Sequence, residues 1–168
     1  LEGNVKLGLL KRLNQVTHYL DVLENIESSI RNVELNVSST NARLLYKDTT
    51  DLVANSLNVI DVSGFKPRLQ QAYTDIQTAE LFNEAVIAAT NAVTTAENSP
   101  TVENVEFAQG LIDALPNIDE KMVLQERLDV VKAQLGKLSE ATEAVAKVET
   151  TLDQTDYDNA FALVEGLN

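Results

Sequence analysis

The sequence predicts an all-helical protein built from tandem three-helix bundles that share long connecting helices. Two observations support this prediction: a composition that favours helices, and an internal repeat whose apolar residues recur at helical spacing. The 168-residue chain has six glycines, three prolines, four phenylalanines, four tyrosines and no tryptophan, which argues against a turn-rich sandwich or barrel. Its apolar fraction of 44% is sufficient for a packed core.

The internal repeat defines the elements. Three copies align without a gap on Arg12, Arg68 and Arg127, each of which precedes a leucine (Leu13, Leu69, Leu128). The steps between the shared apolar columns are 4, 3, 4, 3, 3, 4, 3 and 4 residues, and only a helix places residues at such spacing on one side. The columns that are apolar in all three copies are Leu9/Phe65/Leu124, Leu13/Leu69/Leu128, Val16/Ala72/Val131, Leu20/Ile76/Leu135, Leu23/Ala79/Leu138, Ile26/Phe82/Ala141, Ile30/Val86/Val145, Val33/Ala89/Val148 and Val37/Val93/Leu152.

Each copy predicts one long helix followed by one short helix. The long helices are expected at residues 4–37, 64–97 and 119–152, and the short helices at residues 40–56, 101–115 and 155–166. Ser99 is the expected N-cap of the second short helix, and Thr155 with Asp158 forms a capping-box-like start for the third. The first short helix has the weakest pattern, with Thr50 at the position that Ala108 occupies in the second copy.

The doubled three-residue step falls at the same place in every copy, at Leu23, Ala79 and Leu138, and it rotates the apolar stripe around the helix. We interpret this step as the point where a long helix leaves one bundle and enters the next, as in spectrin-type rods; a single wide bundle is the alternative. The predicted domains are a half-helix that completes a preceding bundle (1–21), two three-helix bundles (22–78 and 79–137) and an incomplete third bundle (138–168).

Charge and composition limit the function classes. The net charge of −13 disfavours binding to nucleic acids, since an acidic surface repels phosphates. The absence of cysteine excludes disulfides and thiolate chemistry, and no apolar run is long enough for a membrane span. We therefore expect neither nucleic-acid binding nor membrane insertion.

No residue pattern predicts a catalytic or cofactor-binding site. His18 is the only histidine and lies on a flank of the first long helix, where we expect it on the surface. The acidic residues Asp153, Asp156 and Asp158 lack the glycine and glutamate of a calcium loop and lie where the start of a helix favours acids. We therefore expect a non-enzymatic protein without a metal or cofactor.

The arginine column is the one strictly repeated set of polar residues. We expect each arginine at a bundle edge, paired with an acid of a neighbouring helix such as Asp113 or Glu165; a row of ligand-binding arginines is the alternative. The tyrosines at the edges of the columns are candidates for an exposed binding patch or for partly buried packing. They are Tyr19, Tyr46 and Tyr73.

Part of the second repeat resembles a known family. The residues concerned are Ala96-Glu97, the segment 111–117 (LIDALPN), and Lys121, Leu124, Arg127 and Leu128. They are similar to the tandem helical repeats, about 55–60 residues long, of Gram-positive bacterial surface proteins, which include S-layer-associated and adhesin-like chains. The resemblance implies a secreted protein linked to the cell wall and transfers no catalytic or binding residue.

The resulting expectation is a structural spacer or stalk that presents other domains away from the cell wall. The alternative is an adhesin-type helical module that binds a host or cell-wall protein. The expected partners are neighbouring domains of the same polypeptide and, in the alternative, a surface or host protein. We expect a monomer, with any targeting signal or anchor outside this segment.

Overall fold

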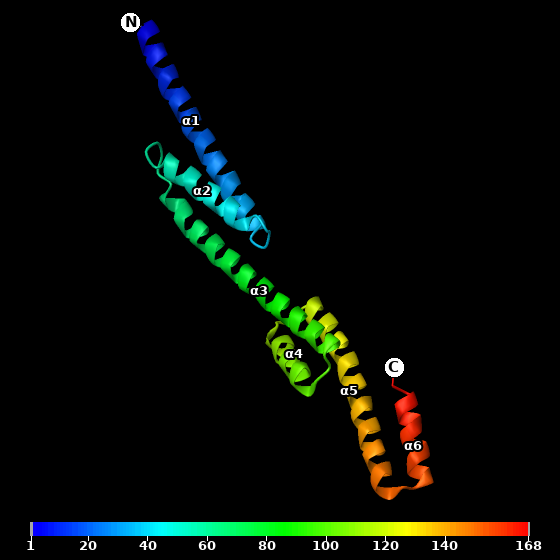
Figure 1. Ribbon diagram of the computed structural model, residues 1–168. Coiled ribbons are helices and arrows are strands. Elements are labelled where there is room, and N and C mark those ends of the chain that lie inside the picture. The colour runs from blue at the N-terminus through cyan, green and yellow to red at the C-terminus, as the bar shows by residue number, and fades with distance from the viewer. Residues whose placement is uncertain (1, 168) are drawn as a thin grey trace. The chain divides into compact units, whose positions relative to one another are not determined.

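The computed structural model describes residues 2–167, and in that part of the chain it contains helices and no strands, which confirms the predicted all-α class (Figure 1). The arrangement in tandem three-helix bundles stays a prediction. Three long helices alternate with three short ones, and every helix end lies within two residues of its predicted position. The elements are α1 (Glu2–Leu35), α2 (Ala42–Ser56), the single-turn helix η1 (Ser63–Phe65), α3 (Lys66–Asn98), α4 (Val102–Ala114), α5 (Asp119–Thr151) and α6 (Gln154–Glu165).

The chain divides into two compact units, which we call the first unit (up to Phe82) and the second unit (from Asn83). The boundary falls within α3, so one helix supplies residues to both units. The finer division into a half-helix, two bundles and an incomplete third bundle stays a prediction.

In the first unit, α1, α2 and the first half of α3 all contribute buried side chains. These form two apolar clusters, linked by Tyr46, which packs against both. The buried members are Ile26, Ile30, Val53, Val62 and Leu69 in one cluster, and Val33, Ala42, Ala72 and Ile76 in the other.

In the second unit, a single apolar cluster draws on the last part of α3, on α4 with its C-cap Leu115, and on the first part of α5. Its buried members are Ala89, Ala92, Val93, Ala96, Val105, Ala108, Ile112, Leu115, Leu124, Leu128 and Val131. The column residues of α3 and α5 therefore face one core, as a 3–4 spacing requires.

Two predicted helix starts need correction. The N-cap of α4 is Thr101 and not Ser99; the Thr101 hydroxyl accepts a hydrogen bond from the Asn104 backbone N–H at 3.2 Å. The N-cap of α6 is Asp153, which lies before Thr155. A β-region residue directly before the first helical turn can reach the free N–H groups of that turn, and the sequence offered several polar residues for this role.

The register of the first short helix also differs from the prediction. Thr49, and not Thr50, is the buried threonine of α2. Its hydroxyl donates to the Leu45 carbonyl at 2.8 Å and lies 2.7 Å from the Ser29 hydroxyl of α1. Both hydroxyls thus find partners inside the helix packing, which allows a polar residue at the position of Ala108.

Candidate functional site

The histidine and the acidic cluster lie on the surface or at a helix start. Within residues 2–167, no group of histidine and acidic side chains is arranged to hold a metal ion. His18 is exposed on α1, as expected. Asp153 Oδ1 accepts hydrogen bonds from the backbone N–H groups of Thr155 (2.8 Å) and Asp156 (3.3 Å), so this carboxylate caps α6.

Two of the three repeated arginines join neighbouring long helices. Arg68 of α3 donates to both carboxylate oxygens of Glu34, at 2.8 and 2.7 Å, and also to Glu27 at 2.7 Å. Both acids lie on α1. A planar guanidinium held by two hydrogen bonds fixes the position of one helix along the other more closely than a lysine would.

Arg127 of α5 also contacts the preceding long helix in the second unit, but at another position of the repeat, since Glu97 lies 29 residues after Arg68 and Glu34 lies 22 residues after Arg12. It donates to the two carboxylate oxygens of Glu97 on α3, at 2.9 and 2.7 Å, and to the Thr94 hydroxyl at 3.3 Å. The acids expected from the sequence, Asp113 and Glu165, are the wrong partners. The arginine column faces the preceding long helix, whereas these two acids belong to short helices.

Arg12, the first member of the column, differs from the other two. It is exposed on α1, and among residues 2–167 it makes no ion pair. The leucines that follow the three arginines show the same contrast: Leu69 and Leu128 are buried, whereas Leu13 is 61% exposed. The first copy thus has the repeat's residues without its contacts.

Two of the paired glutamates have a lowered pKa. The hydrogen bond from Arg68 holds the pKa of Glu34 below its ordinary value of 4.5, and that from Arg127 does the same for Glu97. The same hydrogen bonds raise the pKa of both arginines. The side chains are about one-third to one-half exposed, so solvent screening limits the strength of these pairs.

The candidate tyrosines are all partly buried. Tyr46 and Tyr73 lie with ring centroids 5.3 Å apart, and the guanidinium of Arg43 lies 5.1 Å from the Tyr73 ring centre. Arg43 also donates to Glu80 at 2.8 Å. This group favours the packing role for Tyr46 and Tyr73. No sequence pattern predicts the Arg43–Glu80 contact, because the two residues belong to different helices and to no shared column.

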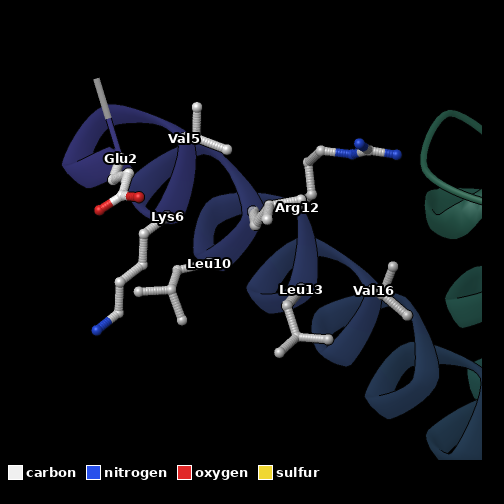
Figure 2. A pocket seen from close by; sticks show the side chains of 8 residues that line it. Glu2, Val5, Lys6, Leu10, Arg12, Leu13 and Val16 are labelled. Atoms are coloured by element: carbon white, nitrogen blue, oxygen red, sulfur yellow. The ribbon is translucent and has the colours of Figure 1, made fainter.

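A first exposed apolar surface lies on α1. We call Leu9, Leu13, Val16 and Leu20 the N-terminal apolar face; all four are between 51% and 61% exposed. Figure 2 shows Arg12 on one flank of this surface and Leu10 on another. All eight residues that line this surface depression come from α1, so it is an uncovered helix side and not an enclosed cavity.

A second exposed apolar surface lies between α5 and α6, and sequence reasoning missed it. It is a groove of about 250 Å³, and we call it the α5–α6 groove. The rings of Tyr157 and Phe161 stack along it with centroids 6.2 Å apart. The groove is lined by Val145, Val148, Glu149, Tyr157, Ala160, Phe161 and Val164.

Neither protein-family models, nor curated proteins, nor solved structures give a match to this chain. None of the helices in residues 2–167 has the length and apolar character that crossing a lipid bilayer requires.

Proposed function

We propose that this chain is a repeat region of a structural spacer, in which tandem three-helix bundles share their long helices and present other domains away from a bacterial cell wall. The observation that supports this most is that α3 contributes residues to the cores of both units. Its first half places Ala72 and Ile76 in the core of the first unit, and its second half places Ala89 and Val93 in the core of the second unit. A helix with residues in two cores is the element that the proposed spacer requires between successive repeats.

The arginine pairs support the same proposal. Arg68 and Arg127 occupy one column of the repeat and each binds an acid on the preceding long helix. The arginine is the repeated member of each pair and the acid is not, since Glu34 and Glu97 stand at different repeat positions. In both units the pair joins one long helix to the preceding one, and in linear arrays length follows from the number of copies. The bacterial surface setting rests on the resemblance of the segment around residues 96–131.

Small-angle X-ray scattering of two chain lengths tests the spacer role. The control is the chain itself, and the variant carries a second copy of residues 57–114 inserted after Ala114, which keeps the repeat in register. We expect the maximum dimension, extrapolated to zero concentration, to grow by roughly 25–50 Å, between half and the whole length of a long helix, with an unchanged cross-section radius. A particle that grows in cross-section and keeps its maximum dimension would contradict the spacer.

A second candidate function is a helical module that binds a host or cell-wall protein. The exposed aromatic pair Tyr157 and Phe161 favours it, because exposed aromatic side chains are enriched in binding surfaces. The test is binding to serum and cell-wall fractions, with Phe161→Ala as the variant and Phe107→Ala, which changes an exposed phenylalanine of α4, as the control. Binding that both variants weaken equally, or that neither weakens, would contradict a specific role for this surface.

A further inference from the structure

The same apolar columns are covered in two copies of the repeat and uncovered in the first. The counterparts of the N-terminal apolar face are buried or partly buried in η1 with α3 and in α5. In both cases they pack against the second half of the preceding long helix and the short helix after it. These counterparts are Phe65, Leu69, Ala72 and Ile76 in the second copy, and Leu124, Leu128, Val131 and Leu135 in the third.

The α5–α6 groove is the surface that such a half-helix covers elsewhere in the chain. Its residues match those of the second unit's core by repeat position: Tyr157 corresponds to Val105, and Val164 corresponds to Ile112. Val105 and Ile112 are buried, whereas Tyr157 is 52% and Val164 is 45% exposed. The difference arises because the second unit's α4 is covered by the first part of α5, and nothing among residues 2–167 covers α6 in the same way.

Charge complementarity aligns the two surfaces. Glu34, the partner of Arg68, lies 22 residues after Arg12 in the repeat, and Glu149 lies 22 residues after Arg127. Glu149 therefore occupies the column of Glu34. It lines the α5–α6 groove and, within residues 2–167, makes no ion pair.

We propose that the N-terminal apolar face of one copy packs into the α5–α6 groove of a second copy of this chain, with Arg12 bound to Glu149. The contact repeats the register in which Arg68 binds Glu34 inside the first unit; the pair of the second unit differs, since Glu97 lies 29 residues after Arg68. A second copy of this chain offers a groove whose apolar and charged residues match the N-terminal apolar face by repeat position. The proposal departs from the monomer expected from the sequence, and it is tested separately from the spacer role.

The two surfaces are different, so the interface is heterologous. Each copy has one donor face and one acceptor groove, and association in this mode adds copies head to tail unless a ring closes. The oligomer size should therefore increase with concentration and should not stop at a dimer with both surfaces still free.

Sedimentation velocity of the full chain tests the proposal, over concentrations from about 1 μM to about 1 mM, which covers weak to moderate association. We expect the weight-average sedimentation coefficient to rise with concentration. Leu13→Asp should abolish that rise. Leu7→Asp is the matched control: Leu7 is 54% exposed on the same helix but lies on its opposite side, so this variant should associate like the wild type. Circular dichroism checks that both variants keep their helix content.

A charge exchange tests the register. R12E and E149R should each weaken association at least tenfold, because each places like charges opposite one another. An equimolar mixture of the two chains should recover association, because either chain then meets a partner of opposite charge, and the double variant R12E/E149R should recover it alone. This recovery does not depend on any effect of the substitutions on folding.

Three outcomes would overturn the proposal. The first is a sedimentation coefficient that does not change with concentration. The pure chain would give this result if the partner of the N-terminal apolar face were a different protein. The second is association that L13D leaves intact, which would place the contact elsewhere. The third is loss of association in both charge variants without recovery in their mixture. The spacer proposal is judged separately, from scattering at infinite dilution.

Discussion

The two units use the same pattern of apolar columns but build cores of different composition. In the second unit, the buried side chains of α3, α4 with Leu115, and the first part of α5 form one continuous and wholly apolar cluster, and Ala141 and Ala160 are buried outside it. In the first unit, they form two clusters, and two polar residues of α2, Thr49 and Ser56, are buried beside them. The comparison shows how far a repeat tolerates polar substitutions at core positions.

The tolerance has a local cause. Thr49 and Ser56 stand at the positions of Ala108 and Leu115 in the second copy, and their hydroxyls donate to backbone carbonyls one turn earlier, at 2.8 and 2.9 Å. Hydroxyls with partners avoid the desolvation cost of unpaired polar groups, but they contribute less apolar burial than alanine or leucine. We therefore expect the second unit to be the more stable of the two.

The largest predicted effect is that of Leu128→Ala. Leu128 is fully buried in the second unit, and its truncation should lower the free energy of unfolding of that unit by about 2–5 kcal/mol. Leu13→Ala, a change in the same repeat column at an exposed position, is the matched control and should cost less than about 0.5 kcal/mol in dilute solution. Hydrogen exchange followed by mass spectrometry measures each unit separately. Equal losses in the free energy of unfolding for Leu128→Ala and Leu13→Ala would contradict the finding that Leu128 is buried and Leu13 is exposed.

The sequence predicted the helices and most core columns because these depend on local spacing. It did not predict the features that depend on how two helices pack against each other. Leu152 satisfies its column but lies at the C-cap of α5 with a φ of 53° and is 85% exposed. The partners of Arg68 and Arg127 depend on the rotation and axial offset of two helices, and an apolar period does not define either quantity. Thr49 was missed because the length of the loop before α2 places the buried threonine one residue earlier in α2 than the repeat alignment predicts.

A double-mutant cycle at Ser29 and Thr49 tests why the first unit tolerates its polar residues. Ser29→Ala and Thr49→Val should each cost about 1 kcal/mol in the first unit, because each removes the hydrogen bond between the two hydroxyls, which lie 2.7 Å apart. The double variant should lie within about 0.5 kcal/mol of the wild type, since both polar groups are then absent. Hydrogen exchange of α1 and α2 reports these changes. Additive costs would mean that the two hydroxyls do not stabilise each other.

Arg127→Met tests the repeated ion pair at a smaller scale. It keeps the apolar stem and removes the hydrogen bonds to Glu97 and Thr94, so the second unit should lose up to about 1 kcal/mol. Arg12→Met is the control in the same column. It should change the stability of the dilute chain by less than the error of the measurement, because Arg12 makes no ion pair within residues 2–167. A larger effect at Arg12 than at Arg127 would contradict the structural role of the pair.

The smallest predicted effect is on the pH dependence of the second unit. Arg127 lowers the pKa of Glu97 below 4.5, so the folded state binds this proton less readily than the unfolded state. The pair therefore stabilises the unit above pH 4.5, and this contribution disappears as the pH falls through the lowered pKa of the folded state. Protonation of other acids also relieves the repulsion of a chain with a net charge of −13, which acts in the opposite direction.

The comparison with Glu97→Gln separates these two contributions, because both chains share the other acids. The wild type should exceed E97Q in stability at pH 7 by a few tenths of a kcal/mol, and the difference should vanish by about pH 3. Added salt should reduce the difference at pH 7, since the side chains of the pair are partly exposed. A difference that persists unchanged at pH 3 would show that Glu97 stabilises the helix contact through packing and not through its charge.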